Sequence, residues 1–150
     1  MIRKLKKLLD GLAPAEIADE ETSLELAVAV LLVEMARADH HLAAEEEAAI
    51  RGLLHQAFKL TPAAAEQLMS EAREKAEDSV SMHEFTRAIH EGMDYAEKQR
   101  VIEMLWQVAL ADQNLDKYED YLIAKLGELL YVSRGDVIRL RNSVQTRLLK

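Results

Sequence analysis

Two stretches of this chain, residues 33–53 and 106–126, carry the same pattern of apolar and acidic residues at an offset of 73 positions. The offset matches acids with acids, pairing Asp39 with Asp112 and Glu46 with Glu119. Apolar matches are expected wherever two helices are both buried, but polar positions have no packing reason to coincide. The repeat therefore predicts a helix–loop–helix unit that is used twice, with the two copies related by a pseudo-two-fold axis.

The shared pattern is A-D-x-x-L-x-x-x-E, with Leu42 or Leu115 at its centre. An apolar residue inside a charged loop is expected to pack against the core. We therefore expect both leucines to be buried and the acids on either side of them to turn outward together.

The rest of the sequence is predicted to be helical almost throughout. The chain has 150 residues, of which 5 are Gly and 2 are Pro, and this scarcity argues against a turn-rich β sandwich or barrel. Periodicity and capping patterns predict eight helices, over residues 2–12, 23–38, 43–58 and 62–77 and then after Ser81, Asp94, Asp116 and Ser133. We therefore expect an all-α bundle of about seven to eight helices that contains the duplication.

Residues 1–21 are predicted to form an amphipathic helix and a linker, ahead of one helical domain over residues 22–150. The apolar face of this helix consists of Ile2, Leu5, Leu8, Leu9 and Leu12. Cations interrupt the apolar positions, so we expect only peripheral contact with a membrane and packing of this face on the bundle or on a second copy. Neither a secretory signal nor an apolar run long enough to span a bilayer is present, which predicts a cytoplasmic protein.

Composition excludes several classes of function. The chain has no Cys, so disulfides, thiolate nucleophiles and Cys-based metal sites are excluded. Acidic residues number 27 and Lys and Arg 19, so the net charge is −8, which argues against nucleic acid as a partner. No phosphate loop, H-E-x-x-H sequence or nucleophile elbow occurs. An enzyme is therefore less favoured than a cation-binding module or a metal-free interaction module.

The acids of the repeat are compatible with two interpretations. Carboxylates in the first turn of a helix are ordinary caps that the helix dipole stabilises. Alternatively, converging carboxylates bind a hard cation such as Ca²⁺, Mg²⁺ or Mn²⁺, which prefer oxygen ligands. The candidate ligands are Asp39 and Glu46 in the first unit and Asp112, Asp116 and Glu119 in the second. His40 and His41 would suit Zn²⁺, but we favour solvated loop histidines over a zinc site.

In a short, acidic, all-helical chain, two A-D-x-x-L-x-x-x-E units resemble those of the TerB family, which is named for bacterial tellurite resistance. The resemblance covers about residues 22–140. It implies a bundle of about seven to eight helices with an internal pseudo-two-fold axis. It also implies a non-catalytic module in a stress or envelope-linked response, with a protein partner or a second copy of the chain.

The same resemblance implies divalent-cation binding by the paired acidic motifs, which carry over to the five candidate ligands. The family commonly has Gly directly after the Asp, where this chain has His40 and Gln113. Ala43 also stands in the first unit where the second has Asp116. We therefore expect the second unit to bind a cation more strongly than the first.

Overall fold

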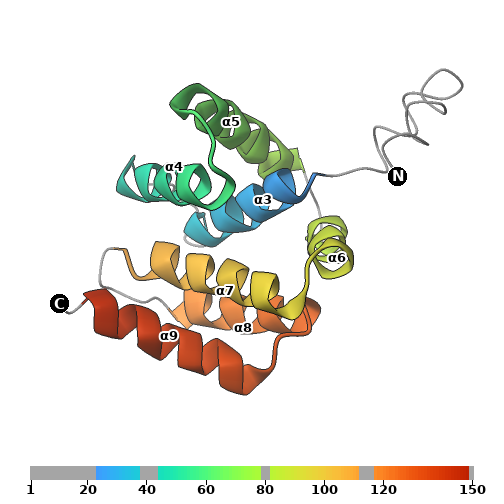
Figure 1. The fold of residues 1–150 in the computed structure, drawn as a ribbon, viewed down its shortest axis with the longest axis vertical. Coiled ribbons are helices and arrows are strands. Elements are labelled where there is room, and N and C mark those ends of the chain that lie inside the picture. Colours follow the sequence, from blue (N-terminus) through green and yellow to red (C-terminus); the bar gives the residue numbers. More distant parts are fainter. Residues whose placement is uncertain (1–22, 38–43, 79–81, 112–116, 149–150) are drawn as a thin grey trace, which may run out of the picture.

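The computed structural model describes residues 23–37, 44–78, 82–111 and 117–148. Over these ranges the chain is helical and strand-free, which confirms the all-α class with about seven helices. The helices are α3 (Leu24–Ala36), α4 (Ala44–Phe58), α5 (Pro62–Asp78), α6 (His83–Gly92), α7 (Tyr95–Ala109), α8 (Lys117–Leu129) and α9 (Arg134–Leu148) (Figure 1). The helix predicted over residues 2–12 lies outside the described residues.

Helix α3 lies at the centre of the fold (Figure 1). Its sequence from Ala27 to Val33 is uninterruptedly apolar, and every one of these side chains is fully buried. A helix that is apolar on all sides has to be covered on all sides. Accordingly, α3 packs against five other helices, which are α4, α5, α6, α7 and α8.

Six of the described helices form two groups, α3 with α4 and α5, and α7 with α8 and α9 (Figure 1). Helices α4 and α5 pack against α3 and against each other, while α8 and α9 pack against α7 and against each other. Contact between α3 and α7 joins the groups, and α6 packs on both α3 and α8. Each group thus consists of three consecutive helices. In both groups the first helix packs on the second and the third, so α3 packs on α4 and α5 as α7 packs on α8 and α9.

Helix boundaries follow the offset of the sequence repeat. The first helices of the two groups end at Ala36 and Ala109, and the second helices begin at Ala44 and Lys117. Lys59 and Tyr131, which follow α4 and α8, both have a positive φ, of 53° and 61°. The amide of the next residue closes each helix by donating to the carbonyl five residues earlier, as in a Schellman motif. These matches support the repeat, while its pseudo-two-fold axis stays a prediction.

Four of the predicted helix starts are confirmed by their capping hydrogen bonds. The side chains of Ser23, Thr61 and Ser133 each accept a hydrogen bond from the amide three residues later, at 3.0, 3.1 and 3.2 Å. Asp94 and Glu97 form a complete capping box, with bonds of 2.8 and 2.9 Å. Asp116 lies outside the described residues.

Ser81, the predicted cap of the next helix, lies outside the described residues. Helix α6 begins at His83, and the side chain of its N-cap residue, Met82, makes no capping hydrogen bond. The buried side chains of this short helix, Phe85, Thr86 and Ile89, face the core. The predicted start of a helix just after Ser81 is therefore confirmed, while the capping role of that residue stays a prediction.

Gly127 allows α8 and α9 to approach closely. A Cβ atom there would lie 2.8 Å from Cγ2 of Val137, whose β-branched side chain has little rotameric freedom. A Cβ at Gly52, in contrast, meets nothing within 4 Å. We expect Gly127→Ala to lower the free energy of unfolding by about 1 kcal/mol, because overpacking outweighs the gain in helix propensity.

The matched variant Gly52→Ala is expected to raise the free energy of unfolding by about 0.5–1 kcal/mol, since only the propensity gain applies there. Urea unfolding followed by circular dichroism measures both variants. Equal shifts for the two would contradict the close approach of α8 and α9.

Candidate functional site

The first turns of α4 and α8 carry the described residues of the two acidic units. Glu46 and Glu119 are the third residues of these helices, as the offset predicts. Glu119 is only 9% exposed, whereas Glu46 is half-buried, and each has an interaction partner in the structure. A buried carboxylate requires such pairing because it has lost its water.

The other candidate ligands lie outside the described residues, and the same holds for the two loop histidines and the two central leucines of the repeat. These residues are Asp39, Asp112, Asp116, His40, His41, Leu42 and Leu115. Among the side chains that the structure does describe, no three His, Asp or Glu residues gather closely enough to hold a metal ion. Convergence of the predicted ligands is therefore still a prediction in both units.

Glu47, the neighbour of Glu46 in α4, takes part in a separate network of ion pairs. Its carboxylate accepts from Arg51 at 3.0 Å and from Arg73 of α5 at 2.5 Å. Glu66 completes the network, 3.4 Å from Arg51 and 4.0 Å from Arg73. This network connects α4 to α5 and gives Glu47 a structural role.

Lys98, which the sequence motifs did not reveal, is only 7% exposed. Its ammonium group lies 2.5 Å from Nδ1 of His90 in α6. A lysine ammonium group has only donors, so Lys98 donates this hydrogen bond. His90 also contacts the ring of Tyr131, with centroids 4.3 Å apart. The helical spacing of Lys98 from the buried residues Val101, Ile102 and Leu105 was the signal that could have revealed it.

A second contact that the sequence did not reveal connects the start of α7 to the start of α9. The Tyr95 hydroxyl donates to Oδ2 of Asp136 at 2.6 Å and accepts from the Ser133 amide at 3.1 Å. The hydrogen bond from Tyr95 is the main cause that lowers the pKa of the Asp136 carboxyl, and bonds from Arg139 and Ser133 add to it. The contact therefore favours the ionised carboxylate.

Tyr95→Phe is expected to raise the pKa of Asp136 toward its ordinary range. A carboxyl with a lowered folded-state pKa stabilises the fold above its unfolded pKa, and this contribution disappears as pH falls through the folded value. The variant should therefore melt below the wild type at neutral pH, and the gap should close in acid. Carboxyl ¹³C titration and melts across pH measure both effects. Tyr131→Phe is the control, and equal Asp136 titration in both variants would contradict the prediction.

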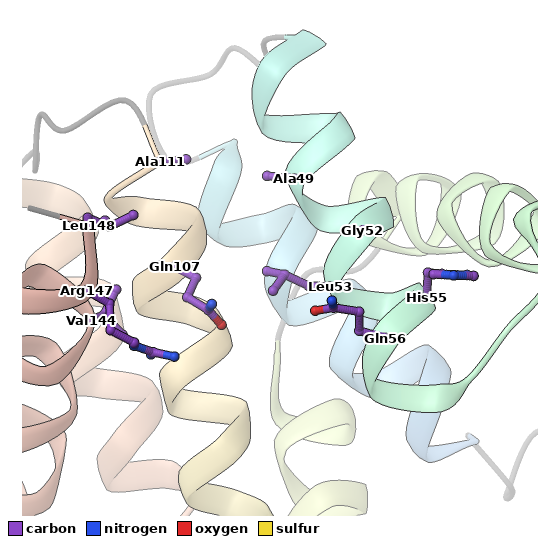
Figure 2. A pocket seen from close by; sticks show the side chains of 10 residues that line it. All are labelled: Ala49, Gly52, Leu53, His55, Gln56, Gln107, Ala111, Val144, Arg147 and Leu148. Atoms are coloured by element: carbon purple, nitrogen blue, oxygen red, sulfur yellow. The ribbon is translucent and has the colours of Figure 1, made fainter. Parts of the chain in front are cut away.

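A groove of about 600 Å³ lies between α4 of the first group and α7 and α9 of the second. Its lining residues are Ala49, Gly52, Leu53, His55, Gln56, Gln107, Ala111, Val144, Arg147 and Leu148. Figure 2 shows Gln56 and Gln107 pointing toward each other from α4 and α7, while His55 points away from α7. Small and aliphatic side chains form most of the lining, so this α4–α7–α9 groove suits an apolar occupant.

Across the described ranges, no helix is both long and apolar enough to cross a membrane.

A comparison with protein families matches residues 25–142 to the family described as tellurite resistance protein TerB. The match spans α3 to α8 and most of α9, and so includes both acidic units. Neither the curated proteins nor the solved structures contain a significant match. Because the family match covers most of the chain and agrees with its all-helical fold, the chain belongs to the TerB family.

Proposed function

We infer that this chain is a non-catalytic helical binding module that takes up a divalent cation at its paired acidic units. It would act in the cytoplasm, in a stress or envelope-linked response, through a protein partner. The observation that carries the proposal is the placement of Glu46 and Glu119 at equivalent positions, the third residues of α4 and α8. Two related cation sites would each need an acidic residue at the same position, and Glu46 and Glu119 fill this position in the first turns of α4 and α8.

The burial of Glu119 supports cation binding by the second acidic unit in particular. Its side chain is 9% exposed, and it follows Asp116 by three residues and Asp112 by seven. Carboxylates held together repel each other, and a divalent cation removes this repulsion. Oxygen ligands favour Ca²⁺, Mg²⁺ or Mn²⁺ over Zn²⁺ in such a site.

The competing proposal is a metal-free interaction module whose acids are helix caps. Asp94 and Glu97 support it, because they show that the same kind of acidic pattern acts as a capping box elsewhere in this chain. Asp116 and Glu119 have the same spacing of three residues. Both proposals leave the chain without a catalytic role.

Calorimetric titration of the full chain with Ca²⁺, Mg²⁺, Mn²⁺ and Zn²⁺ distinguishes the two proposals. We expect binding heat from at least one of the first three ions, and we expect Asp112→Asn with Asp116→Asn to remove most of it. Asp39→Asn should remove less, since the first unit has fewer acids. Absence of heat with every ion would support the metal-free module.

A further inference from the structure

The α4–α7–α9 groove is an unfilled apolar surface between the two groups of helices. Helix α4 packs on α3, α5 and α7, and α9 packs on α7 and α8, so the space between α4 and α9 forms the groove. Leu148 at one side of it is 44% exposed. A Cβ atom added at Gly52 on α4 would meet nothing within 4 Å, so this wall of the groove has open space in front of it.

We propose that the groove binds the amphipathic N-terminal segment of the same chain, residues 2–12, through the apolar face of that segment. Leucines and an isoleucine recur on this face at helical spacing, whereas its cations occupy other positions. An isolated helix of this length is only marginally stable in water, so it needs an apolar surface to pack against. The groove supplies such a surface.

The chain that connects the segment to the fold is long enough to reach the groove. Residues 13–22 precede Ser23, the N-cap residue of α3, and ten residues can extend over about 33 Å. Helix α3 has 13 residues and is therefore only about 20 Å long. Two of the helices that line the groove, α4 and α7, pack directly on α3.

Charge also favours this occupant. Residues 1–10 contain four cations and one acid, whereas the whole chain has a net charge of −8, so the segment is attracted to the rest of the molecule. Arg147 is the only Lys or Arg among the lining residues, and Glu103 neutralises it at 2.8 Å. The groove therefore does not repel a basic segment.

Paramagnetic relaxation in the full chain tests the proposal. The chain has no Cys, so His55→Cys carries a single spin label on the groove's edge, where the side chain points away from α7. We expect this label to weaken the amide signals of residues 2–12. Glu71→Cys, at an exposed position of α5 that does not line the groove, should leave them unchanged.

Two further variants identify the surfaces involved. Gly52→Trp, at a position where an added side chain meets open space, should fill the groove and restore the signals. Leu5→Asp with Leu9→Asp should restore them by removing the apolar face. Amide spectra of α3 to α9 verify that each variant keeps its fold.

Equal effects from the His55 and Glu71 labels would overturn the proposal, and so would signals that stay weak in the Gly52→Trp protein. The alternative occupant is the same segment of a second copy. It is tested by mixing spin-labelled chains that contain ordinary nitrogen with ¹⁵N-labelled chains that carry no spin label. Weakening of the signals of residues 2–12 in this mixture, to the extent that dilution allows, would show that the groove binds the segment of a second copy, which would also overturn docking within one chain.

Discussion

Replacing Trp106 by Ala is expected to lower the free energy of unfolding by about 3–5 kcal/mol. The indole is 2% exposed, and its Nε1 donates to the carbonyl oxygen of Val137 in α9 at 3.0 Å. The guanidinium of Arg141 lies 5.9 Å from the ring centroid. The substitution therefore leaves a cavity between α7 and α9 and removes one buried hydrogen bond between these helices.

Two other variants separate these contributions. Trp106→Phe keeps much of the volume but loses the hydrogen bond, so it should cost less than Trp106→Ala. Tyr121→Ala, at a side chain that is 62% exposed, should change stability by no more than about 0.5 kcal/mol. Urea unfolding followed by circular dichroism is the measurement, because the chain has one Trp and fluorescence would be lost with it. Equal stabilities of Trp106→Ala and Tyr121→Ala would contradict the packing described for α7.

Saturation with a divalent cation is expected to stabilise the fold if the second acidic unit binds one. A ligand that binds only the folded state adds about 2.7 kcal/mol at a hundredfold excess over its Kd. Asp112→Asn with Asp116→Asn should lose this increment, because the amides lack the charge that the cation needs. Asn still caps a helix well, so the metal-free stability of the variant should change little.

The quantity to compare is the difference in melting temperature with and without the ion. Glu128→Gln is a matched control, since Glu128 is an exposed acid of α8 outside the acidic pattern. It should keep the full metal-dependent shift. A wild-type melt that is unchanged by millimolar Ca²⁺, Mg²⁺ and Mn²⁺ would leave the acids as helix caps.

Local interactions made much of this fold predictable from sequence. The caps at Ser23, Thr61 and Ser133 and the box of Asp94 with Glu97 join residues only three apart, so their geometry depends little on the rest of the chain. The apolar run of α3 likewise requires a buried helix whatever its neighbours are. Equivalent positions of Glu46 and Glu119 followed from the repeat alone.

Contacts between distant segments could not be predicted in this way. Whether Asp112 and Asp116 converge with Glu119 depends on a loop outside the described residues, so the candidate cation site stays a prediction. Ser81 also lies outside the described residues, so its capping role stays a prediction too.

The sequence by itself determined the all-helical class and the starts of most helices. It also contains the repeated pattern in which acids pair with acids. Only the tertiary structure decided that Lys98 meets His90, that Tyr95 meets Asp136 across 41 positions, and that α4, α7 and α9 leave a groove between them. The physical reason is range, because caps and periodicity act within one or two helical turns. These contacts instead depend on how whole helices pack, and that packing balances the burial of every apolar face at once.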